Sequence, residues 1–367
     1  MKGFRNISLT VVVCLLIATV SITAQTAYKI SAPYTHKNLT IFLIHGADAS
    51  SNKDLITLEE ALKMKIFKVY ETDDVNELMV ENISSKYDVF IQSGDIVKGG
   101  KQDRVLAISI IIPRNSGKVS IEAFCVESGR WSGRGNESRS EFASSEERVV
   151  TKELKMATNG IVTRSGTGNG SGTGTGSGSG DGVGGGSGTG TGAGRGSQTE
   201  VWKEVENAQK NISANIDATV TVNASSSSLQ LSLENKKLKK DQQEFAKNLE
   251  DITKGRSDVI GYAFAINGKL NSADIYVSNH LFVKLWPKML NAAVVEAISL
   301  AHQPKAETEP APGDVQTFLA DAEKGSEKER GTVARSKVVT RATENEAVYE
   351  MRDRSNNVVH RNYVKLN

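Results

Sequence analysis

A glycine-rich tract near the middle of the chain most constrains how this protein folds. Residues 165–197 are mainly glycine, serine and threonine, and they hold 17 of the 33 glycines in the 367-residue chain. Such a composition buries too little apolar surface to form a core, and as a coil it spans about 30 Å. We therefore expect an insertion that leaves and rejoins one folded domain. Its Gly-x-Gly spacings lack the preceding strand and following helix of a nucleotide-binding loop.

The first 24 residues have the layout of an export signal. Lys2 and Arg5 precede an apolar run over 11–20, and small and polar residues follow it. The run is shorter than the roughly 20 apolar residues that span a bilayer, so we expect cleavage after Ala24 rather than a retained anchor. The sequence thus predicts an exported protein, periplasmic or extracellular, with no integral membrane span after cleavage.

Charge and residue usage argue against several classes of function. Without Lys2 and Arg5, the chain carries 43 basic and 43 acidic residues, a balance that gives no reason to expect nucleic-acid binding. Cys125 is the cysteine that remains after cleavage, which leaves no internal disulfide. The five histidines show no metal-ligand spacing. We expect no metal site and no cofactor.

The first half of the domain, residues 25–164, is predicted to be rich in β-strands. Residues 39–44 form a β-like run, and Thr57-Leu-Glu-Glu60 is a capping box that begins a helix reaching about Met64. Further strands are expected over 66–70, 77–81 and 88–96, with a glycine turn over 94–101.

A hairpin is predicted from residues 105–113 and 118–127, which flank the turn sequence Arg114-Asn-Ser-Gly117. A symmetric register about this turn places Cys125 opposite Leu106 on an apolar face. One step further, it places Arg104 opposite Glu127, which predicts a cross-strand ion pair. A β-bulge would break this register.

The second half, residues 198–302, mixes helices with a hairpin. Helices are predicted over 198–207 and 229–252, and Asn267-Gly268 between two β-like runs is typical of a type I′ turn. A long amphipathic helix follows over 281–298, with Pro287 expected to kink it or to begin its second half.

The C-terminal part is predicted to contain a linker over 303–313, then a short helix and a hairpin within 314–367. The expected fold class is therefore α+β. We expect an antiparallel β-sandwich-like N-terminal half packed with a C-terminal half of helices and a β-hairpin, both belonging to one domain.

The predicted strand ends at 98–104 and 127–131 gather the candidate ligand-binding residues. These are Lys101, Gln102, Arg104, Glu127, Arg130 and Trp131. Gln102 and Arg104 continue an apolar strand face, where polar groups must be paired or must face a cavity. One interpretation is a structural network of Arg104 and Glu127. The other is a pocket in which the basic side chains meet an anionic ligand and Trp131 stacks on it.

Two catalytic alternatives use the same region. Cys125 would serve as a nucleophile only with a low thiol pKa, and its apolar strand face favours a buried, inert thiol. Paired carboxylates for acid–base chemistry would come from Asp95, Asp103 and Glu127, although no spacing in the sequence brings them together.

Several blocks of this chain resemble a bacterial family, the ARG and rhodanese-phosphatase-superfamily-associated protein domain family. They are Gly94–Val105, Phe124–Trp131, Gln198 with Val201-Trp202, Ala265–Leu270 with Asp274, and Leu281–Leu290. The resemblance covers about 38–302, and Cys-Val-Glu-Ser-Gly-Arg-Trp is its most specific block. It implies a shared fold. The family name also suggests genomic company with ADP-ribosylglycohydrolase-like and phosphatase-like proteins.

Three functions follow as hypotheses. The first is an exported ligand-binding or interaction module, which binds an unknown small ligand or an envelope protein at the 98–104 and 127–131 strand ends. The second is a hydrolase-type enzyme that acts there on an ADP-ribose-like or other phosphate-bearing substrate. The third is a structural envelope protein without a ligand.

Overall fold

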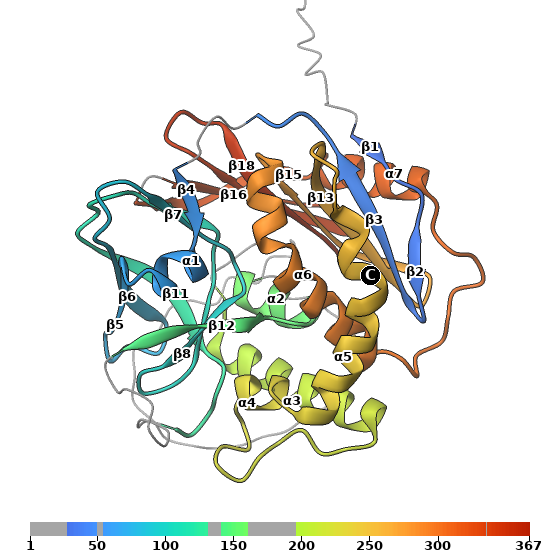
Figure 1. Ribbon diagram of the computed structural model, residues 1–367, viewed down its shortest axis with the longest axis horizontal. Helices are drawn as coiled ribbons and strands as arrows, with labels where there is room; N and C mark the ends of the chain where they lie inside the picture. The colour runs from blue at the N-terminus through green and yellow to red at the C-terminus, as the bar shows by residue number, and fades with distance from the viewer. Residues whose placement is uncertain (1–27, 50–53, 131–140, 161–195, 335) are drawn as a thin grey trace, which may run out of the picture.

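The computed structural model describes residues 28–49, 54–130, 141–160, 196–334 and 336–367. The fold is α+β, as expected from the sequence (Figure 1). The predicted export signal, Trp131 and nearly all of the glycine-rich tract lie outside the described residues. Among the described helices, none has the length and apolarity that a bilayer span requires.

The described strands form three sheets. The largest has nine strands in the order β1–β3–β13–β14–β18–β17–β16–β15, with β2 also paired to β3. Its strands are β1 (Lys29–Ile30), β2 (Tyr34–His36), β3 (Leu39–His45), β13 (Val259–Ile266), β14 (Lys269–Tyr276), β15 (Ser326–Val333), β16 (Ser336–Ala342), β17 (Glu346–Arg352) and β18 (Val358–Lys365).

Two smaller sheets come from the first half of the chain. One has the order β10–β7–β4 and the other β12–β8–β9–β11–β6–β5. Their strands are β4 (Leu55–Thr57), β5 (Phe67–Glu71), β6 (Glu77–Asn82), β7 (Asp88–Ile91), β8 (Asp95–Gly99), β9 (Arg104–Leu106), β10 (Ile110–Ile112), β11 (Lys118–Cys125) and β12 (Phe142–Arg148).

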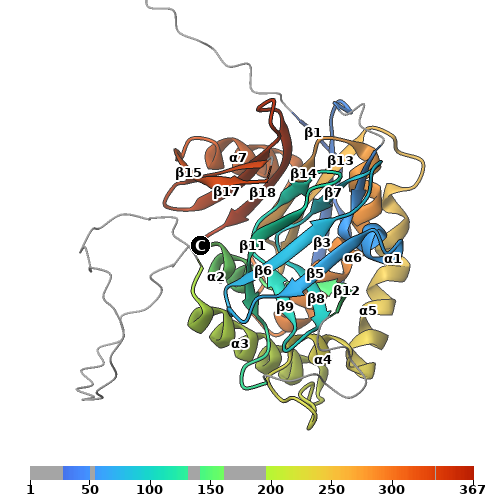
Figure 2. The same ribbon diagram turned by 90° about the vertical axis from the view of Figure 1, so that its left-hand side faces the viewer.

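Helices lie on both faces of the large sheet, with α6 on one face and α7 on the other (Figures 1 and 2). They are α1 (Leu58–Lys63), α2 (Lys152–Asn159), α3 (Gln198–Ile216), α4 (Leu229–Leu233), α5 (Lys236–Leu249), the 3-10 helix η1 (Glu250–Thr253), α6 (Asn279–Ser299) and α7 (Pro312–Ala322). The long helix α6 runs through Pro287 and packs on α3, α5 and β13. Figure 2 shows α7 with the C-terminal strands at the top of the molecule, above α2 and α3.

The two faces of the large sheet carry separate cores. Side chains alternate along a strand, so Ile41 and Phe264 point into the core shared with α6, whereas Phe42 and Ala263 point to the opposite face. That opposite face packs against Val315 and neighbouring apolar residues of α7. Burial on both faces explains why β3 and β13 are almost continuously apolar.

Several elements confirm the sequence analysis. The capping box of Thr57 and Glu60 begins α1, which ends at Lys63. Asn267 and Gly268 both have positive φ, 52° and 76°, as a type I′ turn requires between β13 and β14. The expected C-terminal hairpin is β17 and β18.

The predicted hairpin over 105–113 and 118–127 is wrong. β10 pairs with β7 rather than β11, and the first part of β11 pairs with β6. Only the last residues of β11 reach β9, where Cys125 lies opposite Arg104 instead of Leu106. The register that was expected to set Arg104 opposite Glu127 is therefore not formed, because Cys125 occupies the position opposite Arg104.

Other boundaries also differ from expectation. The single strand expected over 88–96 is the two strands β7 and β8, and β8 occupies the expected glycine turn. The helix over 229–252 breaks after Leu233, where Asn235 caps α5. The sequence does not predict the strands β15 and β16. First-half strands contribute to all three sheets, and the sandwich-like arrangement within that half is not confirmed.

Substituting Gly261 by alanine tests how closely the backbones of β13 and β14 must approach each other. An alanine Cβ at Gly261 would lie 2.3 Å from the carbonyl oxygen of Asp274 and 3.0 Å from the Cα of Ile275. Both are backbone atoms that cannot rotate away, so we expect Gly261→Ala to destabilise the fold by about 2 kcal/mol or more in urea unfolding.

The matched control is Gly313→Ala in α7. A Cβ there meets nothing within 4 Å, and alanine has the higher helix propensity. We expect a neutral or slightly stabilised protein. Equal unfolding free energies for the two variants would contradict the close approach of the strands at Asp274.

Candidate functional site

Three side chains that are far apart in the sequence form one hydrogen-bonded array. Ser109 Oγ lies 3.0 Å from Nδ1 of His360, and Nε2 of His360 lies 2.9 Å from Oδ1 of Asp274. All three residues are buried. A serine, a histidine and a carboxylate in this order are the components that activate a hydroxyl nucleophile.

The register of the large sheet brings the histidine and the carboxylate together. β14 and β18 are antiparallel, with Asp274 opposite Asn362 and Tyr276 opposite His360. Asp274 and His360 are thus diagonal neighbours two residues apart, and such residues share one face of a sheet. Asn362 adds a bond of 3.0 Å from its Nδ2 to Oδ1 of Asp274.

The serine comes from the chain between the two smaller sheets. Ser109 directly precedes β10, and its Oγ accepts a 3.0 Å hydrogen bond from the backbone N–H of Ser93. The Ser93 segment is held in turn by Arg148, whose Nη2 donates to the Ser93 carbonyl oxygen at 2.6 Å. The site therefore lies where the large sheet meets the loops of the smaller sheets.

Aromatic side chains fix the imidazole ring. Tyr276 stacks on His360 with ring centroids 4.7 Å apart and an interplanar angle of 22°. Phe90 contacts the same ring edge-on at 5.9 Å. The ring thus keeps one nitrogen toward Ser109 and the other toward Asp274.

The electrostatic environment keeps Asp274 ionised. Burial alone would raise the pKa of Asp274, but the hydrogen bond from His360 and the positive charges of Arg148 and Lys155 hold it below its usual range. An ionised carboxylate only accepts hydrogen bonds, so Nε2 of a neutral His360 carries the proton. Nδ1 is then free to accept the proton of the Ser109 hydroxyl.

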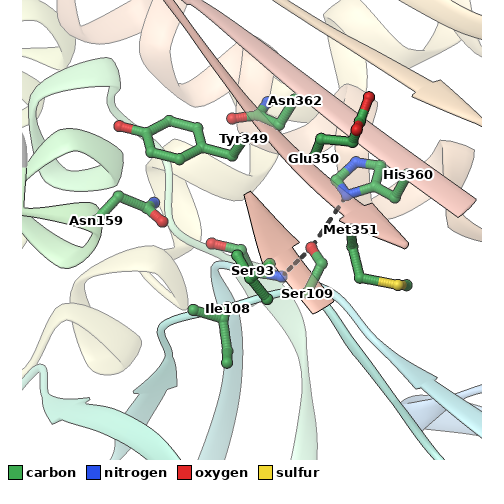
Figure 3. A pocket seen from close by; sticks show the side chains of 10 residues that line it. Ser93, Ile108, Ser109, Asn159, Tyr349, Glu350, Met351, His360 and Asn362 are labelled. Carbon is green, nitrogen blue, oxygen red and sulfur yellow. Dashed lines mark hydrogen bonds between the residues drawn. The ribbon is translucent and has the colours of Figure 1, made fainter. Parts of the chain in front are cut away.

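A small pocket reaches this array (Figure 3). Its cavity volume is about 20 Å³, room for one or two water molecules. The lining includes Ser93, Ser109, Asn159, Tyr349, His360 and Asn362. Figure 3 shows Ser109 and His360 linked on one side of the pocket, with Asn159 and the Tyr349 hydroxyl on the other. The arrangement places the Ser109 hydroxyl and its His360 partner beside this small space.

The strand-end residues predicted from the sequence are brought together, and they bond to one another. Arg104 is fully buried and donates to Glu71 Oε1 at 2.7 Å, to the Val75 carbonyl oxygen at 2.7 Å and to Cys125 Sγ at 2.8 Å. Gln102 accepts from Cys125 Sγ and donates to the backbone carbonyl oxygen of Glu127. Several hydrogen bonds among buried side chains of one cluster are typical of a structural network.

Arg130 and Lys101 have acidic partners as well. Arg130 Nε donates to Glu127 at 2.6 Å, its Nη2 lies 3.6 Å from Asp103, and Lys101 pairs with Asp73. Ligand binding by Lys101, Gln102, Arg104, Glu127 and Arg130 stays a prediction, as does any role of Trp131.

The catalytic alternatives in this region differ in their geometry. Burial raises the pKa of the Cys125 thiol to about 11, so the thiolate that a nucleophile requires is disfavoured. Asp103 and Glu127 meet at Arg130, whereas Asp95 caps the backbone N–H of Gln92 in another loop. No group of three or more metal-ligating side chains occurs in the described part of the chain.

The sequence analysis missed the serine–histidine–aspartate array. Ser109 lies within an apolar run, and His360 shows no spacing to another histidine. Asp274 is part of a family block, but a lone carboxylate in a strand carries no chemical signal. The pairing of β14 with β18 alone brings His360 to Asp274.

The fold and site define an α+β protein with a buried serine–histidine–aspartate array at a small pocket. The model of the ARG and Rhodanese-Phosphatase-superfamily-associated Protein domain matches residues 27–364. The chain therefore belongs to this family, and the match extends beyond both ends of the blocks recognised in the sequence. Comparisons with curated proteins and with solved structures find no significant match.

Removing one member of the Arg104–Glu71 pair tests the structural role of the strand-end network. Arg104→Met leaves the nearly buried carboxylate of Glu71 without its guanidinium partner, so we expect a loss of about 3–5 kcal/mol in urea unfolding.

The double variant Arg104→Met/Glu71→Met removes both charges and should recover most of that loss. An Arg104→Met variant as stable as the unmodified chain would contradict the structural role. It would favour the ligand-binding interpretation of this region.

Proposed function

We propose that this protein is an exported hydrolase that cleaves small acyl esters with Ser109 as nucleophile. The observation that carries the proposal is the continuous array from Ser109 Oγ through His360 to Asp274, with distances of 3.0 and 2.9 Å, at a pocket.

Each member of the array has a defined role in the proposed reaction. Ser109 Oγ attacks the carbonyl carbon of the ester while Nδ1 of His360 takes the hydroxyl proton. Asp274 holds the Nε2–H and stabilises the imidazolium that forms. The imidazolium returns the proton to the leaving alcohol, which departs and leaves an acyl-serine. Water, deprotonated by His360, then releases the acid and restores Ser109.

The size of the pocket restricts the acyl group to a small one. A cavity of about 20 Å³, with room for one or two water molecules, leaves no space for a long acyl chain. Burial of Ser109 and His360 also keeps bulk water from the array, which strengthens its electrostatic interactions.

Export and partner class are proposed from the sequence. The charged, apolar and small-residue segments of 1–24 support cleavage after Ala24 and a periplasmic or extracellular location. Action on an ADP-ribose-like or other phosphate-bearing substrate stays a prediction of the resemblance, and an envelope protein partner stays a hypothesis.

Hydrolysis of 4-nitrophenyl acetate tests the proposed reaction. We expect turnover that falls by roughly 10³-fold or more in both Ser109→Ala and Asp274→Asn. The first variant removes the nucleophile, and the second removes the carboxylate that orients the imidazole and stabilises the imidazolium. A fluorophosphonate probe should label the peptide that contains Ser109.

The matched control is Ser145→Ala, which removes another buried serine hydroxyl, one bonded to Gln230 at 2.6 Å away from the pocket. It should keep turnover and labelling. Melting temperatures separate loss of catalysis from loss of folding. Turnover that survives in a folded Ser109→Ala protein would contradict Ser109 as the nucleophile.

A further inference from the structure

One buried arginine lies beside the serine–histidine–aspartate array without belonging to it. Arg148, the last residue of β12, is 3% exposed and lies outside the lining of the pocket. Its hydrogen bonds go to two uncharged groups, the Ser93 carbonyl oxygen at 2.6 Å and Met289 Sδ at 3.2 Å. Its Nε has no hydrogen-bond partner within the described residues. Because a buried charge bound by neutral groups costs stability, its place beside the array points to a role in the site.

The local structure of β12 directs this guanidinium to the loop that carries Ser93. The register of β12 on β8 shifts between Ser144 and Arg148, so that Arg148 lies opposite Asp95. Shifts of this kind redirect side chains and occur often beside active sites. The guanidinium packs closely on the next residue of the loop, since a Cβ on Gly94 would lie 3.2 Å from Arg148 Nη2. Gly94 has a φ of 90°, a conformation that favours glycine, so loop and guanidinium fit each other closely.

Through Ser93, Arg148 acts on the orientation of the Ser109 hydroxyl. The backbone N–H of Ser93 donates to Ser109 Oγ at 3.0 Å, and Ser93 Oγ donates to the Ala107 carbonyl oxygen at 2.8 Å. A serine hydroxyl that accepts this N–H still has its own proton to donate, and Nδ1 of His360 lies 3.0 Å away as the acceptor. By holding the Ser93 carbonyl oxygen, Arg148 keeps this N–H in place.

Arg148 also acts on the other end of the array through its charge. Arg148 and Lys155 are two positive charges that hold the pKa of Asp274 below its usual range. An arginine keeps its charge when buried, whereas burial lowers the pKa of Lys155. Tyr262 and Tyr276 lie near the same carboxylate, and burial raises the pKa of both hydroxyls, so both stay neutral. Arg148 is therefore the more permanent of the two charges that favour an ionised Asp274.

We propose that Arg148 is a positioning residue for the proposed hydrolase. It holds Ser93 so that the Ser109 hydroxyl faces His360. Its charge also keeps Asp274 in the carboxylate form. The inference rests on the proposed function and deepens it, because it identifies one group that sets both ends of the array. Since Arg148 lies outside the lining of the pocket, its loss is expected to lower kcat and to leave KM unchanged.

Two substitutions separate these effects in the hydrolysis of 4-nitrophenyl acetate. Arg148→Lys keeps the positive charge but lacks the planar guanidinium, and Arg148→Gln keeps an N–H donor but lacks the charge. We expect both to lower kcat about tenfold or more and to change KM less than about twofold. Only Arg148→Gln should move the acid limb of the pH–kcat profile, by about one pH unit upward, because the Asp274–His360 pair then takes up a proton more easily.

The matched control is Arg114→Gln, which removes another guanidinium, one that binds Asp88 at 3.1 Å. It should keep both kcat and the acid limb. Melting temperatures show which variants fold, and Arg148→Lys carries the test if Arg148→Gln does not fold. An unchanged kcat in folded Arg148→Lys would overturn the positioning of Ser93.

Two further outcomes would overturn the proposal. A higher KM with an unchanged kcat would place Arg148 in substrate binding. A lower kcat in folded Arg148→Gln with an unmoved acid limb would leave Arg148 a purely structural residue.

A titration without substrate keeps failure of this proposal distinct from failure of the hydrolase. Carbon-13 NMR of the Asp274 carboxyl, assigned with Asp274→Asn, follows its protonation directly. We expect Asp274 to titrate about one pH unit higher in Arg148→Gln than in the unmodified chain. That shift in a chain without esterase turnover would reject the hydrolase alone, whereas turnover without the shift would reject the role of Arg148.

Discussion

The pairing of β14 with β18 is the interaction on which the rest of the structure depends. It joins the Asn267-Gly268 hairpin of the central chain to the C-terminal hairpin in one sheet. The same pairing makes His360 a diagonal neighbour of Asp274, and Nε2 of His360 lies 2.9 Å from Oδ1 of Asp274. A shift of one residue in the register between β14 and β18 would turn one of these side chains to the face that α7 covers, and the array would be lost. The register that completes the core therefore also builds the site.

Several buried ionisable groups surround Asp274. Burial raises the pKa of Glu296 and lowers that of Lys155, and Arg148 is buried among them. Replacing such groups with apolar ones of equal volume often stabilises a protein. A buried cluster with shifted pKa values beside a pocket is therefore a functional candidate, and its positive charges help to keep Asp274 ionised.

The sequence predicted what local chemistry decides. The capping box at Thr57, the type I′ turn at Asn267 and the α6 helix depend on short-range patterns, and all three are present. The predicted 105–127 hairpin is wrong because residues far apart in the sequence decide which strands pair. β10 pairs with β7 and β11 pairs with β6, instead of β10 with β11. The sequence did not predict the candidate site for the same reason. Ser109, Asp274 and His360 share no spacing. The β14–β18 pairing brings Asp274 to His360, and the packing of the small-sheet loops on the large sheet brings Ser109 to them.

The tautomer of His360 tests the central claim most directly. Nitrogen-15 NMR of the imidazole at pH 8, assigned with a His360→Gln variant, reports which ring nitrogen carries the proton. The array predicts a protonated Nε2 facing Asp274 and an unprotonated Nδ1 facing Ser109, the state in which histidine takes the serine proton. A protonated Nδ1 with an unprotonated Nε2 would contradict the account, because His360 would then have no free nitrogen toward Ser109.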